Sequence, residues 1–73
     1  MTISAEKLKQ LRKAKGVYQK DVANLLNIIE RHYRSYEAGK VDPPTSKTVL
    51  LADYFDVSVD YLVGRTDNPA VNK

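Results

Sequence analysis

The side chains best suited to recognising another molecule lie within one short segment in the first half of the chain. The Arg31 guanidinium can donate two hydrogen bonds to one guanine base, whereas the Glu30 carboxylate can only accept, for example from a cytosine amino group. Arg34 and Ser35 follow one helical turn later. Ile29 either touches a thymine methyl group or packs in the core beside its apolar neighbour, and the sequence leaves both alternatives open. These residue types are suited to contacts with the base edges of DNA.

Enzymatic chemistry has few candidates in this sequence. The chain contains one histidine and no cysteine. His32 stands between Arg31 and Tyr33, and a lone exposed histidine is more often a surface residue than a general base or a metal ligand. The sequence has no glycine-rich phosphate loop and no spacing typical of metal ligands. We therefore expect no enzymatic activity, no cofactor and no metal site.

The length and composition predict one small cytoplasmic domain. Seventy-three residues lie near the lower limit at which a single hydrophobic core suffices for folding. No apolar run approaches the length of a membrane span, and the N-terminus lacks the apolar core of a signal peptide. The absence of cysteine fits a reducing compartment. We therefore expect a cytoplasmic protein without membrane contact.

Positive charge is concentrated in the first half of the chain. Residues 1–40 carry nine lysines and arginines against four acidic residues, a net charge of +5, whereas residues 41–73 carry three against five, a net charge of −2. A basic half of this kind fits an electrostatic attraction to nucleic acid on one face of the protein. A solvated charged surface has the same composition, so charge alone does not decide between the two.

Two short amphipathic segments must position the candidate side chains, and both lie between Gln19 and Gly39. The first has an apolar stripe at helical spacing, formed by Val22, Ala23, Leu25 and Leu26. Asn27 is expected to end this helix in the left-handed conformation, with Ile28 filling the corner that follows. In the second segment Tyr33 and Tyr36 face inward, which leaves the charged residues on the outer side.

A helix is predicted before this pair. It follows the N-cap Ser4 and ends at Gly16, with Leu8 and Leu11 facing inward.

Two helices are predicted after the pair. One covers Thr45–Phe55, because the two preceding prolines stop any earlier helix. Its inward residues are Val49, Leu51, Ala52 and Phe55. A short helix over about Val59–Val63 follows the N-cap Ser58 and ends at Gly64. We therefore expect a domain over residues 1–64 and an extended or disordered tail over residues 65–73.

Several residues recur in a recognisable order around the two central segments. They are Gln19 at the opening, Ala23 in mid-helix, Leu26 before the turn, and then Tyr36-Glu37 and Gly39-Lys40. This order resembles the helix-turn-helix of the Cro and phage-repressor (Xre-like) family. The likeness extends over most of the chain, from KLKQLRKAKG at residues 7–16 to LADYFDVSVDYLVG at residues 51–64. The chain departs from the family pattern at Tyr18, Asn27, Ile29, Ala38 and Thr48.

The resemblance implies an all-α fold of five short helices, similar to the DNA-binding domain of lambda repressor, with the helix-turn-helix at helices 2 and 3. It implies that the third helix reads bases through Ile29, Glu30, Arg31, Arg34 and Ser35. It implies that Gln19 and the free backbone N–H groups at the start of the second helix hold a DNA phosphate. Lys40 is a second phosphate-binding candidate, followed by Lys20 and Arg34, and the alternative for each lysine is a solvated surface charge. It also implies an ion pair between Arg12 and Glu37, which would otherwise be two ordinary surface charges.

This combination predicts a sequence-specific DNA-binding transcriptional regulator, and specifically a repressor that binds a palindromic operator in double-stranded DNA. One such domain makes few contacts, so we expect a homodimer on half-sites about 34 Å apart. In the family the dimer surface often involves the last helix, which makes the candidates Val59, Tyr61, Leu62 and Val63. The alternative is a protein-interaction module with a protein partner, such as an antirepressor, an adaptor or an antitoxin.

Overall fold

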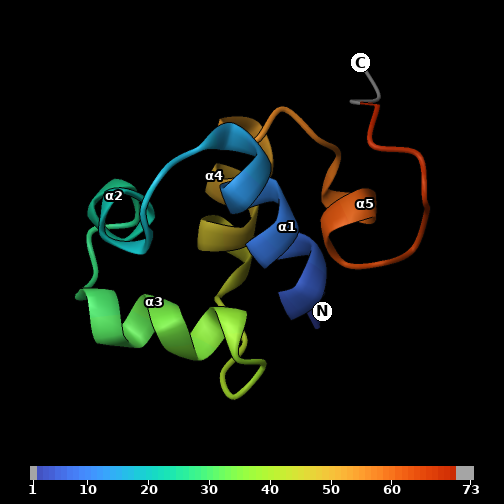
Figure 1. The fold of residues 1–73 in the computed structure, drawn as a ribbon. Coiled ribbons are helices and arrows are strands. Elements are labelled where there is room, and N and C mark those ends of the chain that lie inside the picture. The colour runs from blue at the N-terminus through green and yellow to red at the C-terminus, as the bar shows by residue number, and fades with distance from the viewer. Residues whose placement is uncertain (1, 71–73) are drawn as a thin grey trace.

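The computed structural model describes residues 2–70, which form five short helices (Figure 1). The helices are α1 (Ala5–Lys15), α2 (Gln19–Leu25), α3 (Glu30–Glu37), α4 (Thr45–Tyr54) and α5 (Val59–Leu62). No strand occurs among these residues, so the predicted five-helix, all-α fold is confirmed. None of the helices has the length and the hydrophobicity that crossing a membrane would need, over the part of the chain described. In Figure 1, α2 and the start of α3 lie at one end of the molecule, and α5 lies at the other.

Helix α1 begins and ends at the predicted residues. The Ser4 hydroxyl oxygen accepts a hydrogen bond from the Lys7 backbone N–H at 3.3 Å, which satisfies a donor of the first turn. Gly16 ends the helix with a left-handed φ of 76°. Leu8 is fully buried and Leu11 is partly buried against the core, so this helix packs through one side.

The turn between α2 and α3 has the predicted left-handed residue. Asn27 has a φ of 57°, and Ile28, which follows it, is partly buried against the core. The Lys47 ammonium group reaches from α4 to donate a hydrogen bond to the Leu26 carbonyl at 3.1 Å. This bond satisfies one of the carbonyls that the end of α2 leaves without a helical partner.

Tyr18 precedes α2 where the family usually has a serine or threonine cap. Its side chain makes no capping hydrogen bond. Instead, the Asp21 carboxylate reaches back and accepts a hydrogen bond from the Tyr18 backbone N–H at 2.9 Å. An acidic side chain in the first turn is also favoured by the helix dipole. Asp21 therefore supplies part of the stabilisation that a capping side chain would give.

The core lies where all five helices meet. Tyr33 and Tyr36 are both buried, as predicted, and their rings pack edge to face with centroids 6.2 Å apart. Around them lie the other fully buried large side chains, which are Leu8, Val22, Leu26, Leu51 and Leu62. The inner side of α3 is thus held by two large aromatic residues.

Helix α4 differs from the prediction at one apolar residue. Val49 was expected to face inward, but 41% of it is exposed, so this prediction is wrong. Its neighbour Thr48 is buried instead, and the Thr48 hydroxyl donates a hydrogen bond to the Pro44 carbonyl at 3.3 Å. Because that bond satisfies the hydroxyl within its own helix, a threonine can occupy a core position on α4.

The beginning of the chain is attached to two distant segments. The Ile3 backbone N–H donates to the Asp42 carboxylate at 2.9 Å, and the Ser4 N–H donates to the Leu62 carbonyl at 2.8 Å. Ile3 itself is buried in the core. The segment before α1 is therefore part of the packed domain.

Residues 65–70 contain no helix or strand, and they lie against the domain. The Ser58 N–H donates to the Pro69 carbonyl at 3.0 Å. Lys7 donates to the Thr66 carbonyl at 3.2 Å, and its ammonium group lies 3.6 Å from the Asp67 carboxylate. Residues 65–70 of the predicted tail are therefore anchored to the domain, while residues 71–73 lie outside the described residues.

We predict that Asn27→Ala lowers the free energy of unfolding by about 1 kcal/mol, because alanine has no side-chain compensation for left-handed φ. Asn27→Gly should change it much less, since glycine adopts this conformation without steric cost. Urea denaturation of both variants measures the difference. Asn24→Ala is the matched control, because Asn24 is an exposed residue inside α2. Equal stabilities of Asn27→Ala and Asn27→Gly would contradict the prediction.

Candidate nucleic-acid interface

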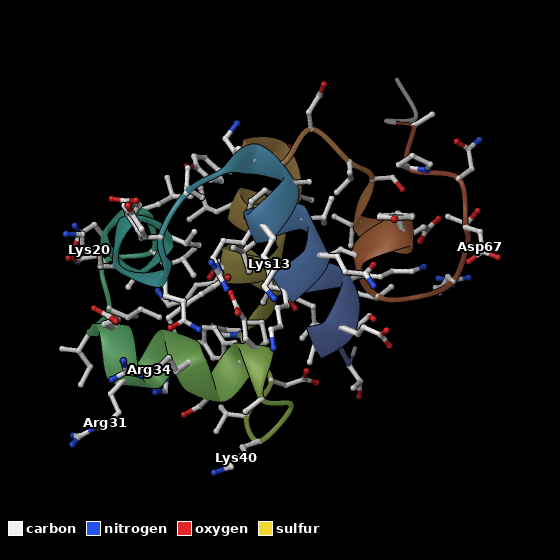
Figure 2. The ribbon with its side chains drawn as sticks, viewed as in Figure 1. Lys13, Lys20, Arg31, Arg34, Lys40 and Asp67 are labelled. Atoms are coloured by element: carbon white, nitrogen blue, oxygen red, sulfur yellow. The ribbon has the colours of Figure 1, made fainter. Side chains whose placement is uncertain are left out.

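The outer side of α3 faces solvent because the two buried tyrosines hold its other side in the core. Figure 2 shows Arg31 and Lys40 pointing away from the molecule. Arg34 is exposed on the same helix, and Ser35 is partly buried at the edge of this face. The Ser35 hydroxyl donates to the Arg31 carbonyl at 3.3 Å, within the helix. We call this exposed side, with Ile29 and Glu30 at its beginning, the α3 outer face.

Ile29 lies at the first position of this face and is not a core residue. It is the N-cap of α3, with an extended backbone, and 62% of it is exposed. The structure therefore excludes the alternative in which Ile29 packs in the core, where Ile28 is instead partly buried. An exposed branched aliphatic side chain remains at the start of the helix, where it is accessible to an apolar group.

Three basic side chains surround a shallow pocket at the other end of the α3 outer face. Arg31, Arg34 and Lys40 line this pocket of about 210 Å³ together with Ser35 and Ala38. None of the described residues that line it is acidic. Since the positive charges are close together and exposed, the pocket attracts anionic groups.

A larger pocket of about 540 Å³ lies between the start of α2 and the start of α3. It is lined by Arg12, Tyr18, Gln19, Lys20 and Glu30. Two of the predicted phosphate-binding residues, Gln19 and Lys20, thus lie next to the first residue of α3. The third, Lys40, lies beyond the other end of that helix. The candidate residues therefore flank the α3 outer face on both sides.

A buried ion pair connects this region with α1. The Arg12 guanidinium donates to both Glu37 carboxylate oxygens, at 2.6 Å and 3.1 Å. Only 13% of the Arg12 side chain and 4% of the Glu37 side chain are exposed. Arg12 also donates to the Val17 carbonyl at 3.2 Å, and the Gln19 amide donates to Glu37 at 3.2 Å. We call these four residues the Arg12–Glu37 network.

The ionisation of the network follows from its hydrogen bonds. Burial by itself would raise the pKa of the Glu37 carboxyl, but the hydrogen bonds that it accepts, mainly from Arg12, outweigh burial and lower that pKa. The hydrogen bond to Glu37 raises the pKa of Arg12. Burial raises the pKa of Tyr33, whose hydroxyl is buried and makes no hydrogen bond within the described residues. Glu37 is therefore a carboxylate and Arg12 a cation at neutral pH.

The helix-turn-helix family model matches residues 8–62, which include most of α1 and all of α2 to α5. The chain belongs to this family, in its Cro and phage-repressor (Xre-like) branch. As a member of the helix-turn-helix family, it has α2 and α3 as the two helices of the motif, and the α3 outer face is on the second of them.

Several proteins that are similar to this chain carry the name of a transcriptional regulator. The chain is 44% identical over 64 residues to the uncharacterized HTH-type transcriptional regulator YobD of Bacillus subtilis (strain 168), covering 88% of this chain and 57% of that protein. It is 35% identical to the cryptic phage CTXphi transcriptional repressor RstR of Vibrio cholerae, covering 82% and 54%. A crystal structure of a transcriptional regulator from Listeria innocua matches with a TM-score of 0.81 and 37% identity, covering 88% of this chain and 61% of that one. The chain thus spans about half the length of the curated relatives that it matches.

One predicted dimer residue of this helix-turn-helix domain lies in the core. Leu62 is fully buried, so the prediction that it belongs to a dimer surface is wrong. The Leu62 side chain is part of the hydrophobic core. Val59, Tyr61 and Val63 are each partly exposed. The Lys7 ammonium group lies over the Tyr61 ring, 4.3 Å from the ring centroid.

Two features of the site were not predicted from the sequence. Glu30 and Arg34 form an ion pair with an N–O distance of 3.0 Å, although their spacing of four residues on one helix is a known signal for such a pair. The second feature is Tyr18, which is 70% exposed and lines the larger pocket. The Lys20 ammonium group lies 5.7 Å from its ring centroid.

We predict that Arg12→Ala and Glu37→Ala each lower the free energy of unfolding by about 3 kcal/mol, because each leaves a buried charge without its partner. The double variant should cost clearly less than the sum of the two single losses. Urea denaturation of the four proteins measures this coupling. Additive losses would show that the two residues do not interact energetically.

We also predict a pH dependence that belongs to Glu37. Because its pKa is lower in the folded protein than in the unfolded chain, its contribution is complete above about pH 4.3 and is lost as the pH falls from there through the folded-state pKa. The free energy of unfolding of the wild type should therefore fall more steeply below this pH than that of Glu37→Gln. Parallel curves between pH 7 and pH 3 would refute the prediction.

Proposed function

We propose that this helix-turn-helix protein is a sequence-specific DNA-binding transcriptional regulator, a repressor that occupies a palindromic operator as a dimer. The observation that carries the proposal is the exposed, mostly charged α3 outer face, which two buried tyrosines hold away from the core. An α-helix presented in this way fits the major groove of DNA. The name of RstR, a transcriptional repressor, supports the assignment.

Base reading falls to five residues on α3 and its N-cap. Arg31 is exposed and points away from the molecule, so it can bind both acceptors of a guanine, a contact worth about 1 to 3 kcal/mol of discrimination. Exposed Ile29 can contact a thymine methyl group. Glu30 accepts from an amino group at a base edge, while Arg34 and Ser35 act one turn later.

Phosphate binding falls to residues on either side of that face. Lys20 and Lys40 are exposed cations, and each can neutralise a phosphate on the DNA backbone. Gln19 is partly buried and donates its amide N–H to Glu37. The Arg12–Glu37 network therefore restrains the side chain that would meet the phosphate. Such contacts orient the domain on the duplex without reading sequence.

Occupancy of an operator requires more affinity than one such domain supplies. Binding of a single domain without sequence preference has dissociation constants of about 10⁻⁴ to 10⁻⁶ M at physiological salt. Two copies on half-sites about 34 Å apart double the contacts. The partly exposed residues Val59, Tyr61 and Val63 are the dimer candidates that remain on α5 and its C-cap. We also propose that the protein acts in the cytoplasm.

We predict that selection from random duplex DNA enriches a palindrome whose half-site spacing gives the dimer geometry. Arg31→Ala should relax the preference at one base pair in each half-site and cost about 1 to 3 kcal/mol per contact there. Lys40→Ala should preserve the selected sequence, weaken binding to all sequences, and reduce the salt dependence by about one phosphate contact. Binding titrations at several salt concentrations measure these effects.

Failure to enrich any sequence at low salt would overturn the proposal. The α3 outer face would then be assigned to contacts with another protein. Enrichment of a single half-site without its inverted copy would retain DNA reading but overturn the palindromic dimer.

A further inference from the structure

The Glu30–Arg34 ion pair places two opposite charges on the surface that is proposed to meet DNA. The Arg34 guanidinium lies 3.0 Å from the Glu30 carboxylate, and both side chains are about half exposed. Glutamate four residues before arginine is the favourable order for such a pair on a helix. Arg34 therefore already has an anionic partner in the free protein.

Arg34 occupies a central place among the basic pockets. It lines the 210 Å³ pocket with Arg31 and Lys40, and it also lines a second pocket of about 270 Å³ with Lys9 and Gln19. A phosphate that entered either pocket would compete with Glu30 for the same guanidinium. Both pockets are therefore less attractive to an anion while the ion pair is closed.

Glu30 is also the acidic group that a phosphate would meet at the other end of the face. It lines the 540 Å³ pocket with Gln19 and Lys20. Glu37 is the other acid among the linings of these three pockets, and it is buried and bonded to Arg12 and Gln19. The negative charge of Glu30 thus opposes phosphate in that pocket, while its bond to Arg34 reduces attraction in the other two.

From this arrangement we infer that Glu30 is a specificity-determining residue that acts through Arg34, an inference that rests on the proposed function. On unrelated DNA, the carboxylate retains Arg34 and repels phosphates, so binding without sequence preference is weak. On the operator, a correctly placed base amino group replaces the guanidinium as the partner of Glu30. Arg34 is then released to bind DNA. Glu30 therefore exchanges Arg34 for a base amino group only where the DNA sequence places that group correctly.

Binding to a duplex of random sequence tests the first half of this exchange. Glu30→Gln should tighten that binding about three- to tenfold, and the plot of log K against log salt should become steeper by about 0.9, the slope of one additional phosphate contact. The increase in affinity for the random duplex should be much smaller when Glu30→Gln is introduced together with Arg34→Gln. The ratio of operator affinity to random-duplex affinity should fall in Glu30→Gln.

Asp60→Asn is the matched control. Asp60 is an exposed acid whose carboxylate lies 3.9 Å from Arg65, and it belongs to α5, which Figure 1 shows at the end of the molecule away from α2 and the start of α3. The control makes the same change in net charge, and we expect less than about a twofold effect on random duplex. Thermal melting followed by circular dichroism verifies that each variant is folded.

Two results would overturn the inference. One is equal tightening by Glu30→Gln and Asp60→Asn, which would assign the effect to net charge alone. The other is an equal effect of Glu30→Gln with and without Arg34, which would remove the role of the ion pair. If the wild type selects no operator, the proposed function fails, whereas the random-duplex measurements still decide whether Glu30 restrains Arg34.

Discussion

The ion pair between Arg12 and Glu37 is the interaction on which the placement of the α3 outer face depends. It joins α1 to the end of α3, and through Val17 and Gln19 it also holds the connection to α2 and the beginning of α2. A two-pronged guanidinium–carboxylate contact is directional, so it sets orientation as well as distance. Removing either partner leaves a charge in a site with little access to water. The network therefore fixes the positions of α1, α2 and α3 relative to one another.

The buried tyrosines add a second restraint to the same helix. Tyr33 lies in the core, where burial raises the pKa of its phenol, and the charge of the nearby Glu37 carboxylate adds to this increase. Tyr36 packs edge to face against it. Large rigid rings at these two positions resist rotation of α3 about its axis, because rotation would expose apolar surface. The polar network and the aromatic packing thus fix the inner side of α3 in the core and leave its outer side accessible.

Local residue chemistry predicted most of the fold. Ser4, Gly16 and Asn27 each act within their own turn of chain, so their conformations could be predicted without a partner. Burial on short helices was harder, because an apolar residue such as Val49 or Leu62 faces the core or the solvent according to which helices pack nearby. The resemblance to a family pointed to Arg12 and Glu37, which are 25 residues apart. No local pattern indicated that residues 65–70 would be anchored by Lys7 and Ser58.

These hydrogen bonds join the beginning of the chain to α5 and to the residues that follow it. The Ser4 N–H bonds to Leu62, and Lys7 bonds to Thr66 at a separation of 59 residues. These bonds are shared between the segment that contains Ser4 and Lys7 and the segment formed by α5 and the residues after it. Opening of either segment therefore removes hydrogen bonds from the other. We expect the two segments to open together in local unfolding, although they lie at opposite ends of the described sequence.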